Sequence, residues 1–216
     1  NEKRQGDNRP YGKAGYIQLE GMFPEGHPYR WSTIGSMEDL NAASLDDVKH
    51  WFETYYGASN AVLVVAGDVN PDEVFERVKH YFGDIDPGPA LNKPERWIAK
   101  RTESSRDRMY DEVAQARISK SWNTPSFGEE DSVYLEIAAE ILAGGKNSLL
   151  YKRLVYEDQI ASSVNAMQLP LEIAGIFEVE AYAKPGVPLS QIEAAINEEM
   201  AEFLRRGPTR DQLERV

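Results

Sequence analysis

The sequence predicts an α+β protein with two related modules, and three observations lead to that fold class. Residues 44–56 and 190–206 repeat apolar side chains every three to four positions, which is the period of a helix with one buried face. Residues 61–66 form a short apolar, β-branched run typical of a buried strand. The order strand, turn, helix in residues 61–82 recurs in residues 177–204, which hints at an internal repeat.

A proline-rich stretch predicts the boundary between the modules. Residues 86–94 contain three prolines and one glycine, a composition typical of a linker. We therefore place one domain at residues 1–94 and a second at residues 95–216.

In the first module the clearest element is a helix over residues 44–56. Ser44 is a suitable N-cap and Asp47 supplies a carboxylate to the first turn. Before this helix, residues 1–43 are rich in turn signals after a short helical start. The apolar stripe of the helix consists of Leu45, Val48, Trp51, Phe52 and Tyr55.

A strand and a second helix follow in the first module. Residues 61–66 predict the buried strand, and Asn70 with Pro71 opens a helix that ends near residue 82. The expected core face of this helix is Val74, Phe75, Val78, Tyr81 and Phe82.

The second module is predicted to alternate strands and helices. We expect strands at residues 112–122, 162–169 and 175–183, and helices at residues 131–143, 148–156 and 190–206. Thr209, with Gln212 three residues later, has the pattern of a capping box at the start of another helix. Because the sequence starts at Asn1 and stops just after this helix start, we expect it to be an excerpt of a longer protein.

Composition excludes several classes of function. The 216 residues carry a formal net charge of −12, which disfavours nucleic-acid binding and docking on anionic membranes. No cysteine is present, so disulfides, thiolate metal sites and cysteine nucleophiles are excluded. No apolar run approaches the roughly 18 residues of a membrane span.

The three histidines do not assemble an active site by themselves. His50 and His80 lie off the apolar stripes of their helices and are expected at the surface, and His27 sits in a turn. A hydrogen-bonded loop histidine is the favoured interpretation of His27, with a substrate-pocket role as the weaker alternative. No metal-binding HExxH pattern or its inverse occurs, and no phosphate loop or nucleophile elbow occurs either.

An ordered series of short motifs is more informative. Asn1-Glu2-Lys3-Arg4-Gln5 is followed by Asn8-Arg9-Pro10-Tyr11-Gly12, Phe23-Pro24-x-x-His27-Pro28-Tyr29 and Ile34-Gly35-Ser36-x-x-Asp39-Leu40. The Trp51-Phe52-x-x-Tyr55-Tyr56-x-x-x-Asn60 helix end and Val64-Val65-Ala66-Gly67-Asp68-Val69 come next. In this order the series closely resembles the pitrilysin/insulinase, or inverted-zincin, family of zinc metallopeptidases, over essentially the whole chain.

The resemblance implies a metal-binding role for one residue. In that family two histidines and a catalytic glutamate lie on one helix as HxxEH, and a third zinc ligand is a glutamate in a later helix. Glu2 matches that glutamate. A catalytic zinc takes three protein ligands and keeps one position for water. The resemblance therefore implies that the full-length protein is a zinc-dependent endopeptidase. This segment lacks HxxEH, so alone it is expected to be inactive and to bind no zinc.

The second module departs from the family where an Arg and a Tyr usually assist substrate binding. Alignment on Ser148-Leu149-Leu150-Tyr151 places Val155 and Ser162 at those positions. Neither side chain can replace a guanidinium or a phenol as a donor. The pair is therefore expected from a second peptidase half, in the same polypeptide or in a partner subunit.

The family also implies the architecture and two other readings of the function. Each module should be a mostly antiparallel β-sheet with helices on one face, and the first module should be incomplete, without its early strands and the HxxEH helix. A non-catalytic subunit or half that serves as a scaffold is the first alternative, and an acidic α+β binding module without catalytic ancestry is the second. The bacterial periplasm or envelope is the expected location, from the resemblance alone.

Overall fold

A computed structural model describes residues 1–216 and divides the chain into two units. The first unit comprises residues 1–34 and 95–216, and the second comprises residues 35–94. One unit boundary coincides with the predicted linker, but residues 1–34 belong to the same unit as the second half. The assignment of residues 1–94 to a single family domain stays a prediction. No helix in the chain combines the length and apolarity that a bilayer-spanning helix needs.

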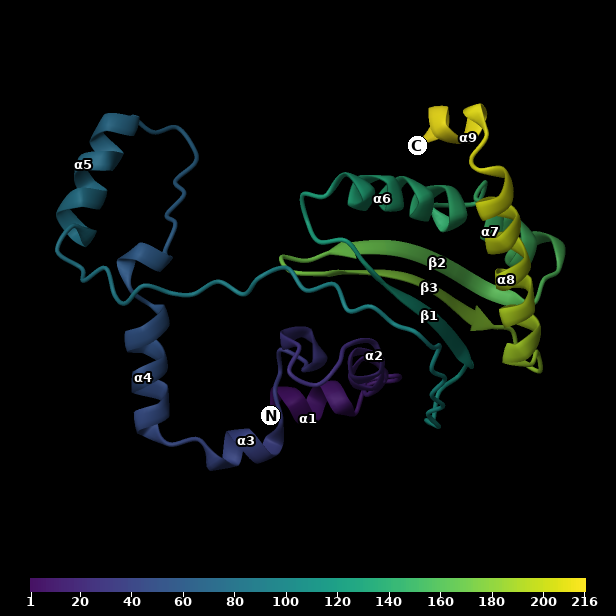
Figure 1. The fold of residues 1–216 in the computed structure, drawn as a ribbon, viewed down its shortest axis with the longest axis horizontal. Helices are drawn as coiled ribbons and strands as arrows, with labels where there is room; N and C mark the ends of the chain where they lie inside the picture. Colours follow the sequence, from purple (N-terminus) through teal and green to yellow (C-terminus); the bar gives the residue numbers. More distant parts are fainter. The chain divides into compact units, whose positions relative to one another are not determined.

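A three-stranded antiparallel sheet forms the centre of the first unit (Figure 1). Its strands are β1 (Arg117–Thr124), β2 (Ala161–Pro170) and β3 (Gly175–Ala183), in the order β1-β3-β2. The central strand β3 carries the most apolar sequence and is buried along nearly its whole length. Alternate residues point to opposite faces, so the sheet has one face toward α6 and α8 and one face toward α1 and α2.

The main core lies between the sheet and the helices that follow β1. These are α6 (Glu130–Ala143), α7 (Leu149–Tyr151), a π-helix (Lys152–Glu157) and α8 (Leu189–Arg206), and Figure 1 shows them on one side of the sheet. Ile192 and Ile196 of α8 are fully buried in the same cluster as Val179 of β3. Burial of such side chains contributes about 1.5–3 kcal/mol each, so this face stabilises the unit.

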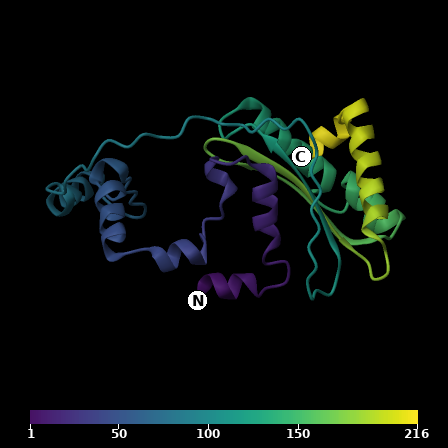
Figure 2. The same ribbon diagram turned by 60° about the horizontal axis from the view of Figure 1, so that its bottom comes forward.

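The opposite face of the sheet, here called the α1 face, is partly covered by α2 (Ala14–Met22), and α1 (Glu2–Asp7) is tied to α2 through Lys3, Asp7 and Tyr16. The Gln18 side chain donates a hydrogen bond to Ser121 Oγ of β1, and the Asn123 amide donates to the Met22 carbonyl. Figure 2 shows these two helices on the side of the sheet away from α8. The predicted one-sided helix layer is confirmed for the second half, and α1 and α2 add a second, partial layer.

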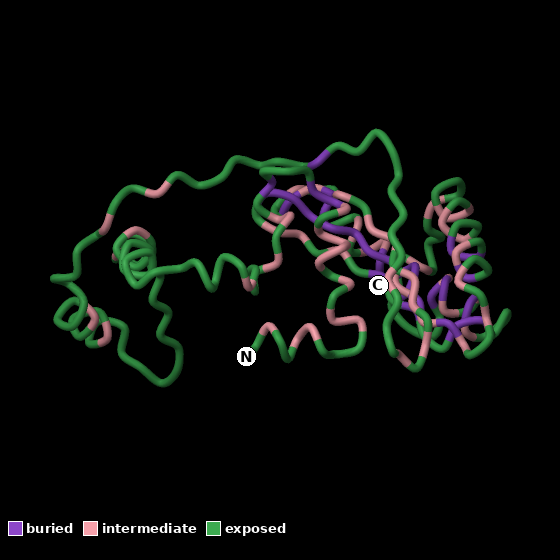
Figure 3. Tube along the Cα trace, turned by 90° about the horizontal axis from the view of Figure 1, so that it is seen from below, coloured by how far each residue is buried: buried purple, intermediate pink, exposed green.

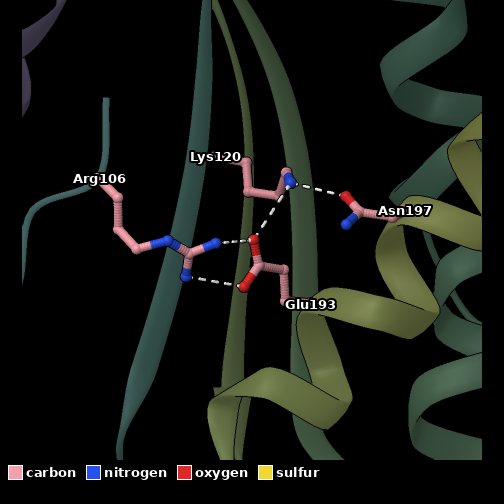
Figure 4. A network of polar contacts seen from close by, with 4 residues as sticks. All are labelled: Arg106, Lys120, Glu193 and Asn197. Atoms are coloured by element: carbon pink, nitrogen blue, oxygen red, sulfur yellow. Dashed lines mark hydrogen bonds and ion pairs between the residues drawn. The ribbon is translucent and has the colours of Figure 1, made fainter. Parts of the chain in front are cut away.

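The segment between residues 95 and 116 has no regular structure and is tied down by an ion-pair network (Figure 4). Arg106 donates two hydrogen bonds to the Glu193 carboxylate of α8, one of them 2.9 Å long. Lys120 of β1 lies 3.8 Å from the same carboxylate and donates to Asn197. The hydrogen bonds from Arg106 are the largest of the effects that lower the pKa of Glu193, so the network stays charged well below neutral pH.

The second unit contains helices and no strand. Its elements are α3 (Met37–Ala42), α4 (Leu45–Tyr55), a short 3-10 turn (Ala58–Asn60) and α5 (Pro71–Phe82). The predicted caps are confirmed: Ser44 and Asp47 form a reciprocal capping box on α4, and Asn70 accepts hydrogen bonds at the start of α5. No residue of this unit is buried, and Figure 3 shows its trace as mostly exposed with a few intermediate positions, among them Val74 and Val78 of α5.

Two predictions for the second unit are therefore wrong for this chain. Residues 61–66 form no strand, and Val62 is 91% exposed. Apolar residues expected in the core of α4 and α5 are also exposed, Trp51 at 56% and Phe75 at 67%. Both differences have the same physical reason. A strand needs a neighbouring strand for its backbone hydrogen bonds, and an amphipathic helix needs an apolar surface to pack against. Residues 35–94 contain neither partner.

Boundaries in the second half agree with the prediction with two differences. β1 begins at Arg117, later than expected, and the helix predicted at residues 148–156 is a short α-helix followed by the π-helix. Gln159, just beyond the π-helix, has a left-handed φ of 54°. Helix α2 was not predicted, because its glycines and mixed polarity give it no clear apolar stripe.

The exposed apolar surface of residues 35–94 predicts self-association. We expect the scattering mass of the chain to rise above 24.4 kDa with concentration, because apolar surface and unpaired extended backbone promote contacts between molecules. Replacing Val62 and Val64 together by lysine should shift this association to severalfold higher concentration. Light scattering over a concentration series measures both effects.

A matched control places the same charges elsewhere in the unit. Asn41 and Asn92 are exposed polar positions, and their double substitution by lysine should leave the association close to that of the unchanged chain. A chain that stays monomeric at the highest concentration would contradict the prediction.

Candidate functional site

Glu2 is the first residue of α1, and its side chain is exposed with no hydrogen bond or ion pair to another residue. The helix that carries it is held in place by neighbouring contacts. Lys3 lies 4.2 Å from the centre of the Tyr16 ring of α2 and 3.6 Å from Asp7. The Tyr16 hydroxyl in turn donates to Asp7 over 2.7 Å. The Glu2 carboxylate is therefore free on a helix whose position is fixed.

Glu2 does not belong to a group of side chains that could hold a metal ion within this chain. No group of three or more His, Asp or Glu side chains is placed to hold a metal ion. A single carboxylate suits one position of a zinc site, and imidazoles or further carboxylates must complete the rest. The residues present thus fit the role of one ligand in a larger site.

His27 is part of an aromatic cluster rather than a pocket. Its side chain is fully buried, stacks on Phe23 at 4.4 Å and packs against Trp97 at 4.6 Å. Nδ1 accepts the Tyr29 backbone N–H at 3.0 Å, and Nε2 donates to the Trp97 carbonyl at 2.8 Å. Because both ring nitrogens have partners, this geometry favours the structural interpretation of His27 and leaves no free donor for a substrate.

The cluster joins the N-terminal helices to the far end of the β2–β3 hairpin. The Ile173 N–H donates to the Tyr29 hydroxyl, and the Trp97 N–H donates to the Ile173 carbonyl. Both elements therefore meet around His27, which explains why residues 1–34 pack in the same unit as the second half. His50 and His80 are exposed, as predicted.

Val155 and Ser162 have local structural partners. Val155 lies in the π-helix and packs against the main core. Ser162 is the extra residue of a β-bulge in β2, where it accepts a hydrogen bond from Gln115 and donates one to the Tyr182 carbonyl. Neither position provides a cationic or phenolic donor.

Sequence reasoning missed an arginine–tyrosine cluster on the α1 face. Arg117 lies over the Tyr11 ring at 4.6 Å and pairs with Glu180 at 2.9 Å. Tyr182 meets Tyr11 edge to face, and burial raises the pKa of the Tyr182 phenol. Tyr11 has a left-handed φ of 60°, held by its N–H bond to Asp111 and its hydroxyl bond to the backbone carbonyl next to β1.

This cluster left only a weak signal in the sequence. The alternation of polar and apolar residues in β1 and β3 assigns Arg117, Glu180 and Tyr182 to one face, but not to one another. The Arg117 guanidinium is already paired with Glu180 and stacked on Tyr11, so it is not free to bind a ligand. The cluster instead holds the loop around Tyr11 against the sheet.

The antiparallel sheet with helices packed against it defines the class of the chain, an α+β protein. Residues 42–216 match the family described as "Peptidase M16 inactive domain". The chain belongs to this family, which is the inverted-zincin family that the motif series resembles.

Individual relatives agree with the assignment. The chain is 28% identical to the zinc protease PqqE of Helicobacter pylori, over 97% of this chain and 48% of that protein. It is 20% identical to the non-peptidase homolog YmxG of the same organism, over 87% of this chain and 43% of that protein. The chain thus spans about half the length of the curated relatives it matches.

Solved structures share the fold. The crystal structure of a protease from Helicobacter pylori superposes with a TM-score of 0.86 at 25% identity, covering 99% of this chain and 52% of that chain. A peptidase M16 inactive domain from Pseudomonas fluorescens superposes with a TM-score of 0.83 at 18% identity, over 99% of this chain and 51% of that one.

Removal of the His27 side chain should destabilise the first unit. His27→Ala deletes the stack on Phe23 and strands two buried hydrogen-bonding groups, at an expected loss of about 3 kcal/mol in the free energy of unfolding. Urea denaturation measures it. His50→Ala, at an exposed position, should change it by less than about 0.5 kcal/mol. Equal effects of the two substitutions would show that His27 is not a structural anchor.

Zinc should bind the 216-residue chain only weakly. One carboxylate without neighbouring ligands cannot hold a transition metal tightly, so titration calorimetry should give no tight one-to-one step. An acidic protein of similar net charge is the control. A stoichiometric, tight zinc site in this chain would contradict the ligand-by-ligand interpretation of Glu2.

Proposed function

We propose that the chain is part of a zinc-dependent metalloendopeptidase in which Glu2 is the third protein ligand of the metal. The observation that carries the proposal is the free Glu2 carboxylate at the start of an anchored helix, within the asparagine–glutamate–basic pattern. The similarity of nearly the whole chain to a zinc protease supports it. The two histidine ligands and the catalytic glutamate belong to an HxxEH helix in another part of the full-length polypeptide.

In this proposal the residues of this chain position one zinc ligand, Glu2, and peptide hydrolysis takes place only in the complete site of the full-length protein. Zinc, when bound, lowers the pKa of a water molecule and polarises the peptide carbonyl. Glu2 holds one side of the metal with a carboxylate oxygen. Lys3 and Tyr16 fix the helix, so that Glu2 is presented with little loss of conformational entropy.

A second peptidase half completes the substrate site. Val155 is packed into the core and Ser162 is committed to a bulge, so neither position can donate to an oxyanion or a substrate carboxylate. The donors come instead from a complementary half, within the same polypeptide or in a partner subunit. The substrate is a peptide or an unfolded protein segment.

A non-catalytic role in the same family is the second candidate. The lack of an Arg–Tyr pair at Val155 and Ser162 favours it, and so does the resemblance to a relative named as a non-peptidase homolog. The two readings differ in one sequence feature, because a peptidase needs an intact HxxEH motif in the full-length protein and a scaffold does not.

The role of Glu2 is tested by Glu2→Gln in the full-length protein. The substitution keeps the shape of the side chain and removes its charge, so zinc affinity should fall on the order of 100-fold and peptide cleavage should fall with it. Metal content by atomic emission and cleavage of an unstructured peptide measure the two effects.

Glu25→Gln is the matched control, because Glu25 is an exposed glutamate in a nearby turn. It should leave both zinc content and cleavage unchanged. Full zinc occupancy in Glu2→Gln would overturn the ligand assignment, and a protein that binds zinc without cleaving any peptide would support the non-catalytic reading.

A further inference from the structure

Glu178, at the middle of β3, lies on the α1 face of the sheet, the face against which α2 packs. It pairs in register with Ser121 of β1 and Met167 of β2. Ser121 is the residue that accepts the hydrogen bond from Gln18 of α2, which identifies the face. Glu178 therefore sits in the floor of this face, at the border between the part that α2 covers and the part that it leaves open.

The Glu178 side chain is buried yet has no partner. Only 9% of the residue is exposed, and it makes no hydrogen bond and no ion pair. The next carboxylate on the same face, Glu180, is satisfied by Arg117 and Ser119. The side-chain atoms that are sealed from solvent without a partner belong to Asn123 and Ser126, so the Glu178 oxygens still reach the surface of the face.

A carboxylate with a buried stem and oxygens that reach the surface is only partly hydrated. A charge withdrawn from water loses hydration free energy, and structural carboxylates recover it through donors or cations. Glu178 recovers none within the chain, so a cation that reaches it gains a partly desolvated, charge-assisted contact.

The surroundings of Glu178 define the shape of that cation. Met167, directly opposite on β2, is 40% exposed, and Leu169, two residues further on the same face, is 42% exposed. The carboxylate is thus bordered by open apolar surface. A lysine or arginine side chain matches both parts, since its aliphatic stem covers apolar surface while its charged end pairs with the carboxylate.

We propose that Glu178 is a specificity subsite that takes a Lys or Arg side chain of an extended peptide lying across the α1 face. The proposal rests on the proposed function, because it assumes a peptide substrate. The net charge of −12 adds long-range attraction for a basic peptide. A bare metal ion is a poorer match, since no group of three metal-ligating side chains surrounds Glu178.

The test compares two unstructured peptides that differ in one residue, arginine or its uncharged analogue citrulline. Fluorescence anisotropy with the 216-residue chain should give about tenfold tighter binding of the arginine peptide. In Glu178→Gln, which keeps the side-chain shape, the preference should fall to about one. Circular dichroism and the melting temperature establish that the variant is folded.

Glu157→Gln is the matched control. Glu157 is an exposed glutamate at the end of the π-helix, and its loss changes the net charge equally while the preference should remain. An unchanged preference in Glu178→Gln, no binding of either peptide, or displacement of the arginine peptide by millimolar magnesium would each overturn the subsite. Because binding is measured without cleavage, a failure here is distinct from a failure of the zinc-ligand assignment.

Discussion

The apolar contact between β3 and α8 is the interaction on which the rest of this structure depends. Val179 and Ala181 of the central strand and Ile192 and Ile196 of the helix are almost fully excluded from water. Strand side chains alternate between faces, so burying these residues fixes which residues point the other way. A slip of one residue in β3 would put Glu178 and Glu180 into the core, and the cost of burying two charges makes the register firm.

Because the register is firm, the polar composition of the α1 face is a consequence of the core. That face receives Arg117, Ser121, Glu178, Glu180 and Tyr182. Helix α2 covers part of it, through Gln18 at Ser121 of β1 and Met22 in the same cluster as Ile176 of β3. Most of the covered polar groups are mutually satisfied, as the Arg117–Glu180 pair illustrates. Helix α1, which carries the exposed Glu2, is tied to α2 by the contact of Lys3 with the Tyr16 ring, and α2 lies against this same face.

Local sequence predicted what local physics determines. The Ser44–Asp47 and Thr209–Gln212 capping boxes need only residues three apart, and both are present. The strands and α8 of the second half form as predicted, because their packing partners lie within the chain. Residues 61–66 have equal strand propensity and form no strand, since pairing is a property of two segments.

The residues of the candidate sites show the same limit of prediction from local sequence. Glu2 could be assigned only through resemblance, because an exposed glutamate without neighbours has no chemical signature of its own. The unpaired state of Glu178 could not be predicted from the sequence. Periodicity indicates which face of the sheet a residue occupies, but not whether a hydrogen-bond donor lies within reach of its side chain. His27 was favoured as a structural histidine from its place in a turn, but its partners Trp97 and Phe23 are set by tertiary packing and could not be named from the sequence.

The unpartnered groups of this chain are of two kinds, and chemistry separates them. Exposed apolar side chains in residues 35–94 gain free energy from any dry surface that fits, so they indicate contacts that complete a fold or an assembly. A buried carboxylate without a partner gains nothing from a dry surface and much from a cation, so it indicates a ligand. Glu178 is of this second kind, whereas Glu2 is exposed and its proposed role rests on resemblance. Glu2, open to solvent, can be joined by other ligands around a small metal ion, whereas Glu178, recessed in a sheet, is accessible to a long flexible cation that approaches across the face.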